Sequence, residues 1–206
     1  FLQGRPLSEG ELIIPRGTSE WSSLHSCIRE LIVTDHSFIS LSSLSLQYML
    51  SLEKLIIGSF SFMGNEVSSS FSLEHLPKLQ EIELGFSSFS HTDAFSLSDL
   101  PSLQSLILHG TNFYHSQQCS IKDLSSLKTI EVGYESFFFV HLIEFRSKNS
   151  WLICLSDLPS LTSIRLHEGA FNGDSSSLNN SLYLESRKFS WFLMSRSSFF
   201  TVDSPR

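Results

Sequence analysis

The sequence predicts a mainly β repeat solenoid: a right-handed coil with a parallel sheet on its concave side and short strands or extended segments on its convex side. Three observations predict this fold. Apolar residues recur in fixed columns, the columns return about every 24 residues, and one column holds a Phe in every unit. A unit of this length cannot bury its own apolar face, so successive units must stack and share one core.

The concave strands are predicted from two columns counted from a recurring anchor residue. The anchors are Ile28, Leu52, Leu79, Leu103, Leu127 and Leu161, at intervals of 24, 27, 24, 24 and 34 residues. Three residues after the anchor stand Leu31, Leu55, Ile82, Leu106, Ile130 and Ile164, and five residues after it stand Val33, Ile57, Leu84, Leu108, Val132 and Leu166. Side chains two positions apart on a strand share a face. The columns therefore predict parallel strands near residues 28–33, 52–57, 79–84, 103–108, 127–132 and 161–166.

The interior and the convex side are predicted from two further patterns. The tenth residue after each anchor is Phe38, Phe62, Phe89, Phe113, Phe137 or Phe171, and we expect these rings to form a buried ladder between the two layers. Apolar residues also alternate later in each unit, at Leu44 and Leu46, Phe71 and Leu73, Phe95 and Leu97, Cys119 and Ile121, and Ile153 and Leu155. This alternation favours short strands or extended segments over helices.

The breaks in the pattern define the organisation of the chain. Residues 26–186 are expected to form six repeats, with a polar, solvent-exposed insertion near 63–70 and an apolar insertion near 138–152. The second insertion either adds exposed aromatic surface or folds back over the solenoid. Residues 1–25 are expected to form an irregular N-terminal cap or the tail of a preceding repeat, with one capping strand near Leu12. Residues 187–206 are expected to form an irregular, aromatic C-terminal cap or tail.

The repeated motif L-x-x-L-x-L, as at Leu103, Leu106 and Leu108, resembles the leucine-rich repeats. The Phe- and Ser-rich units are most similar to the BspA-like branch, found in surface proteins of microbes and protists, and the resemblance covers residues 26 to about 185. It implies a module that binds a protein or glycan through its concave sheet. One column departs from the family pattern, which has Asn or Cys there, because it contains His36, Phe60, Ser87, Thr111, Glu135 and Gly169. Hydroxyl groups or water are therefore expected to satisfy the turning backbone.

Composition excludes several classes of protein. The net charge is −7 and the 14 Lys and Arg residues are spread thinly, which argues against nucleic-acid binding. Three cysteines exclude a disulfide scaffold. No apolar run approaches the roughly 20 residues of a membrane-spanning helix, and residues 1–6 do not show the basic and apolar pattern of a signal peptide. Because the first residue is Phe1 rather than Met, we expect the chain to be an excerpt of a longer protein.

No catalytic or cofactor motif is present, so neither an enzyme nor a cofactor is predicted. G-x-S-x-G, the phosphate-binding loop and H-E-x-x-H are all missing. His91 and His115 share a column in adjacent units, but no carboxylate or Cys completes a ligand set, so no metal site is expected. Cys119 is expected to be a small core residue.

The candidate site for a partner is the exposed side of the concave strands. It centres on Ile56, Glu81, Glu83, Ile107, His109 and Glu131, which combine apolar contact with acidic groups. The partner is expected to be a protein, a peptide or a glycan. The simpler interpretation is that β-branched residues stand there for strand propensity alone. Two other classes stay open: a purely structural array within a larger surface or scaffold protein, and an enzyme whose catalytic domain lies outside these residues.

Overall fold

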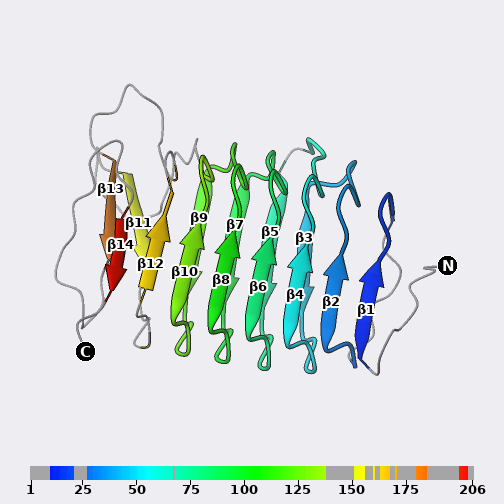
Figure 1. Cartoon of the computed structure of the whole chain (residues 1–206), viewed down its shortest axis with the longest axis horizontal. Coiled ribbons are helices and arrows are strands. Elements are labelled where there is room, and N and C mark those ends of the chain that lie inside the picture. The colour runs from blue at the N-terminus through cyan, green and yellow to red at the C-terminus, as the bar shows by residue number, and fades with distance from the viewer. Residues whose placement is uncertain are drawn as a thin grey trace.

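The chain forms a β-solenoid of parallel strands (Figure 1). The computed structural model describes residues 10–20, 27–66, 68–137, 151–155, 160, 163–167, 170, 180–184 and 200–203. These residues form about four turns in continuous detail and contain strands, turns and bends but no helix. The predicted fold class is therefore confirmed as a mainly β repeat solenoid of stacked parallel sheets.

One layer is an eight-stranded sheet, which holds the strands predicted for the concave side. Its spatial order is β1 (Glu11–Ile14), β2 (Glu30–Val33), β4 (Lys54–Ile57), β6 (Glu81–Leu84), β8 (Ser105–Leu108), β10 (Thr129–Val132), β12 (Ser163–Leu166) and β14 (Phe200–Asp203). All six predicted strands are present inside their predicted ranges and pair in parallel. β1 is the expected capping strand and pairs in parallel with β2. β14 is the exception to the parallel rule, since it runs antiparallel to β12.

The second layer is a six-stranded sheet formed by the return segments. It contains β3 (Leu44–Gln47), β5 (Ser70–Glu74), β7 (Ala94–Ser98), β9 (Gln118–Lys122), β11 (Trp151–Leu155) and β13 (Asn180–Leu184), in spatial order from β3 to β13. Each of these strands pairs in parallel with its neighbours. Strands and not helices form this side, as the alternating pattern predicts. One strand of the first layer and the strand that follows it in the second layer make up one coil.

The core between the layers contains the predicted Phe ladder. Phe38, Phe62, Phe89, Phe113 and Phe137 are at most 1% exposed. Ring centroids of neighbouring coils lie 4.5 Å apart for Phe62 and Phe89, 5.5 Å for Phe89 and Phe113, and 5.0 Å for Phe113 and Phe137, with nearly parallel planes. Phe71 and Phe95 from the second layer stack on each other and meet this ladder edge-on. Phe171, the last predicted member, lies outside the described residues.

A ladder of small polar side chains satisfies the buried turns next to these rings. It consists of the residues that directly precede the Phe column: Ser37, Ser61, Ser88, Asn112 and Ser136, all fully buried. The backbone N–H of Ser61 donates to Ser88 Oγ, and that of Ser88 donates to Asn112 Oδ1. The side chains of Ser61, Ser88 and Ser136 also donate to backbone carbonyls of the preceding coil, and Asn112 Nδ2 donates to the carbonyl of His109 in its own coil. Hydroxyl groups do form hydrogen bonds with the backbone of the turns, as expected. Asn112 takes part as well, and it stands one residue after Thr111, the member of the column where the family pattern has Asn or Cys.

The same turns place non-glycine residues in the left-handed backbone region. In five successive coils the two residues flanking the polar ladder position have φ between 51° and 60°: His36 and Phe38, Phe60 and Phe62, Ser87 and Phe89, Thr111 and Phe113, and Glu135 and Phe137. This conformation costs about 1–2 kcal/mol per L-residue. Burial of one Phe ring per turn and hydrogen bonds between coils offset that cost.

The two predicted insertions differ in how much of them the structure describes. In the first, Asn65, Glu66 and Ser68 are exposed, whereas Ser69 is buried and Ser70 begins β5. In the second, residues 138–150 lie outside the described residues. Most of the predicted C-terminal region, 187–206, lies outside them too. Within the described part of the chain, no helix has the length and apolar character needed to cross a membrane.

Candidate partner-binding face

The residues that point away from the core of the eight-stranded sheet form two straight rows, which we call the outward face. The first row contains Glu11, Glu30, Lys54, Glu81, Ser105, Thr129 and Ser163, and the second contains Ile13, Ile32, Ile56, Glu83, Ile107, Glu131 and Arg165. The pairing register aligns every member of a row with the next. These side chains are half-buried or exposed, whereas the residues between them on β2 to β10 are buried.

The six candidate residues lie close together on this face. Ile56 is on β4, Glu81 and Glu83 are on β6, Ile107 is on β8 and Glu131 is on β10, while His109 directly follows β8. These four strands are adjacent in the sheet. Parallel neighbours are about 4.8 Å apart, so a single extended peptide can contact all six side chains.

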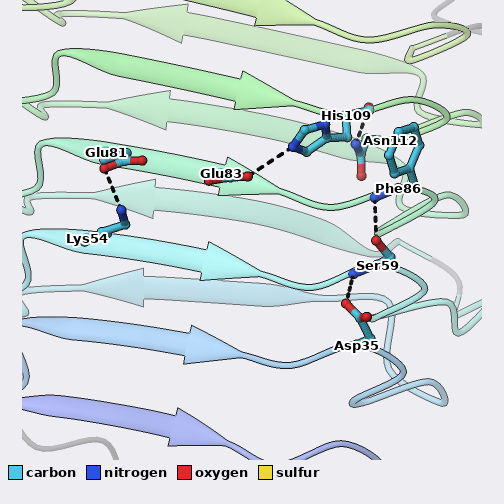
Figure 2. A network of polar contacts seen from close by, with 8 residues as sticks. All are labelled: Asp35, Lys54, Ser59, Glu81, Glu83, Phe86, His109 and Asn112. Atoms are coloured by element: carbon cyan, nitrogen blue, oxygen red, sulfur yellow. Dashed lines mark hydrogen bonds and ion pairs between the residues drawn. The ribbon is translucent and has the colours of Figure 1, made fainter.

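Each carboxylate in this group has a partner on a neighbouring coil. Lys54 Nζ lies 2.9 Å from Glu81 Oε2, and His109 Nε2 lies 3.1 Å from Glu83 Oε1 (Figure 2). Glu131 contacts Arg165 Nη1 at 3.2 Å and His167 Nε2 at 3.0 Å. The hydrogen bond from Lys54 to Glu81 raises the pKa of the lysine, and burial of the ammonium group opposes this rise. Exposed ion pairs contribute about 1 kcal/mol or less, so an incoming group can compete for these carboxylates.

Aromatic side chains lie along the edge where the strands of this sheet end. Phe60 is 41%, Phe86 52% and Tyr134 51% exposed. The Phe86 ring packs against the His109 imidazole, with centroids 5.2 Å apart (Figure 2). Sequence reasoning missed these residues because it assigned Phe to the interior. The signal was available, since Phe60 and Phe86 stand outside the Phe column and precede its members Phe62 and Phe89.

The backbone of this edge is connected from coil to coil. Asp35 Oδ1 accepts from the backbone N–H of Ser59 at 2.7 Å, and Ser59 Oγ accepts from the backbone N–H of Phe86 at 3.1 Å (Figure 2). Further along, the backbone N–H of Thr111 donates to the carbonyl of Tyr134 at 2.7 Å. The exposed rings are therefore attached to a backbone that neighbouring coils hold in place.

A second pair of histidines, His91 and His115, lies outside this face, where the stacking of adjacent coils brings the two side chains together. His91 and His115 stack with centroids 5.0 Å apart. Burial lowers the pKa of His115, and the positive charge of a protonated His91 lowers it further. Among the residues that the structure describes, no group of three His, Cys, Asp or Glu side chains is arranged to hold a metal ion.

Cys119 is buried in the core, as the column pattern predicts, and burial raises the pKa of its thiol to about 12. Because the thiolate is the reactive species, Cys119 is expected to resist a maleimide in the native protein at pH 8. Cys27, which is exposed, is expected to react. Peptide mass spectrometry after brief labelling checks this, with labelling in denaturant as the control. Equal labelling of both cysteines in the native protein would contradict the packing of β9.

Comparison with known proteins gives no match: neither a protein-family model, nor a curated protein, nor a solved structure is similar enough to this chain to place it in a family.

Proposed function

We propose that the chain is a binding module for a protein or peptide and that the outward face around Glu83 and Ile107 is its site. The observation that carries the proposal is the alignment of Ile56, Glu83, Ile107 and Glu131 in one row across four adjacent strands. Apolar and acidic side chains alternate along that row. Such a surface offers hydrophobic contact and charge selectivity to the same extended ligand.

The resemblance to leucine-rich repeats supports this proposal, and we propose that kinship for the chain too, with the BspA-like branch as the nearest type. Its support is the L-x-x-L-x-L motif, in which the last two apolar residues are the buried positions of each strand in the eight-stranded sheet. Repeat solenoids of several families bind through an extended sheet surface of this kind. A glycan is the other ligand class that the resemblance implies.

A purely structural array is the second candidate, and one observation favours it. The carboxylates Glu81, Glu83 and Glu131 are paired with side chains of neighbouring coils. Pairing of this kind stabilises the stacking of coils without any ligand. Under this alternative the outward face has no site, and the chain acts as a spacer or scaffold.

Reversing two charges on the face tests the first candidate. A library of random 12-residue peptides is selected against the intact chain, and selected peptides are measured by calorimetry. The variant Glu83→Lys/Glu131→Lys is expected to bind the selected peptides at least about tenfold more weakly. Each reversal replaces the attraction between a carboxylate and a cationic group of the peptide by repulsion, next to an apolar contact. The matched control is Glu66→Lys/Glu74→Lys, which changes the net charge equally away from the face and is expected to bind normally.

The insertion near 138–152 is the competing site, because it is rich in aromatic residues, which often anchor interfaces. Deleting residues 139–150 tests it. Unchanged affinity in the charge-reversed variant would show that the outward face is not the binding site. Loss of binding on deletion would then assign the site to the insertion. If neither change altered binding, or if the library yielded no peptide, the structural array would be the better account.

A further inference from the structure

The outward face has a second, longer period, because its chemistry repeats every two coils. The coils of β6 and β10 combine an outward glutamate with an exposed aromatic residue three positions later: Glu83 with Phe86, and Glu131 with Tyr134. The coils of β4 and β8 have an isoleucine and a small residue at the same two positions: Ile56 with Ser59, and Ile107 with Gly110. An acidic and aromatic pair therefore alternates with an apolar and small pair.

Two histidines follow the same period and hold the two carboxylates in the same way. His109 Nε2 lies 3.1 Å from Glu83 Oε1 (Figure 2), and His167 Nε2 lies 3.0 Å from Glu131 Oε1. Each histidine directly follows its strand, β8 or β12, in the coil after its glutamate. The structure therefore contains one arrangement twice, a carboxylate held by an imidazole in a coil with an exposed ring. We call the two copies, Glu83 with Phe86 and Glu131 with Tyr134, the acidic sites.

Both acidic sites are accessible to a ligand that carries a positive charge. The side chain of Glu83 is 35% exposed and that of Glu131 is 34% exposed. His109 contacts one oxygen of Glu83, while Arg165 and His167 contact the two oxygens of Glu131. An ionised carboxylate accepts about four hydrogen bonds, so each glutamate can accept a further donor. The contact of Arg165 at 3.2 Å shows that a guanidinium group fits beside Glu131.

The distance between the sites decides the conformation of the ligand. The sites lie two strands apart in the sheet (Figure 1), which is about 9.6 Å because parallel neighbours are about 4.8 Å apart. In a polyproline II helix, residues three apart share a face and lie about 9.3 Å apart. Residues on one face of a β-strand lie about 6.8 Å apart, and residues seven apart in an α-helix lie about 10.5 Å apart. Polyproline II therefore matches the spacing best among the regular conformations.

We propose that the outward face binds a proline-rich segment of a partner protein in the polyproline II conformation, with a basic residue at every third position. Two successive basic side chains donate to Glu83 and Glu131, and the prolines between them contact Ile107, which lies between the sites in the same row. The exposed rings of Phe86 and Tyr134 add aromatic surface of the kind on which proline-rich segments dock. The proposal rests on the proposed function, since it names the chemistry of a partner for the same face.

The experiment is an NMR titration of the intact chain with two peptides of identical composition. Acetyl-Pro-Pro-Arg-Pro-Pro-Arg-Pro-Pro-amide has its arginines three residues apart, and acetyl-Pro-Pro-Arg-Pro-Arg-Pro-Pro-Pro-amide has them two apart, on different faces of the helix. The first peptide is expected to bind about fivefold more tightly, because only it reaches both carboxylates at once. It is also expected to shift the amide signals of Glu83 and Glu131. Equal affinities, or no shift with the first peptide, would overturn the proposal.

A third peptide separates conformation from charge. It keeps the arginines three residues apart and replaces every proline by glycine, so its backbone must be ordered on binding. It is expected to bind more weakly than the first peptide. Binding as tight as that of the first peptide would overturn the polyproline II conformation, and displacement of the first peptide by a neutral oligosaccharide at equal concentration would favour a glycan as the ligand instead.

The variant Glu131→Gln removes the charge of one acidic site. It is expected to bind the two proline peptides equally, because a single arginine of either peptide can serve the remaining carboxylate. Glu83→Gln removes the other charge and is expected to give the same result. The matched control is Glu74→Gln, which changes a carboxylate of the second layer and is expected to keep the fivefold difference. A preserved difference in both Glu131→Gln and Glu83→Gln would overturn the proposal.

These outcomes separate the two proposals. If Glu83→Lys/Glu131→Lys abolishes binding of the library-selected peptides while the two proline peptides bind equally to the unmodified chain, the outward face is the site and the spacing of basic residues is not what it recognises. If the charge reversal is also silent, both proposals fail together.

Discussion

Replacing Phe113 by Ala is expected to lower the free energy of unfolding by about 3–5 kcal/mol, the usual cost of deleting a core Phe. The Phe113 ring is fully buried and stacks on Phe89 and Phe137, and it meets Phe71 and Phe95 edge-on. One substitution therefore removes contacts to three coils at once. The loss is a large part of the 5–15 kcal/mol that stabilises a typical domain.

Urea denaturation followed by circular dichroism measures this loss. Phe113→Leu is the matched control: it keeps most of the apolar volume and the same backbone conformation, so a smaller loss is expected than for Ala. A loss below about 1 kcal/mol for Phe113→Ala would mean that the Phe column does not pack in the core, since an exposed Phe costs little to remove.

Replacing Asn112 by Ala is expected to cost about 1–3 kcal/mol, because it removes the acceptor of a buried donor. The backbone N–H of Ser88 donates to Asn112 Oδ1 at 3.0 Å, and both residues are fully buried. Water cannot replace the lost partner without entering the packed turn. Differential scanning calorimetry measures the effect as a fall in melting temperature.

The matched control for Asn112→Ala is Asn112→Ser, which gives this coil the residue that other coils have at the same position. Ser61, Ser88 and Ser136 occupy the same position, and each offers its Oγ to the preceding coil. Asn112→Ser is therefore expected to retain most of the stability lost in Asn112→Ala. Equal losses in the two variants would show that the side-chain volume matters and that the hydrogen bond does not.

The layers and their register could be predicted from the sequence because the repeat leaves few alternatives. A slip of one residue in β6 would turn Ile82 and Leu84 outward and Glu81 and Glu83 into the core. Stacking of equal units then aligns each column across the sheet. For the same reason the positions of Ile56, Glu83, Ile107 and Glu131 in one row followed from spacing alone.

The turns could not be predicted in the same way, because the sequence does not display their backbone conformation. Thr111 and Glu135 have left-handed φ values that side chains of these types seldom adopt. The polar ladder was sought one residue too early for a related reason: the turn buries the side chain of Asn112 and leaves that of Thr111 half-buried. Only the path of the chain through the turn shows which side chain faces inward.

The sequence by itself determined the repeat length, the parallel strands, the buried Phe column and the two outward rows, because hydrophobic burial at a fixed period leaves few arrangements. Only the tertiary structure decided which charges pair. The contacts of Glu83 with His109 and of Glu131 with His167 join residues 26 and 36 positions apart. It also decided that Phe86 and Tyr134 meet over Gly110. Contacts between side chains of different coils depend on the turn geometry and on distances of a few ångströms, which the amino-acid sequence alone does not specify.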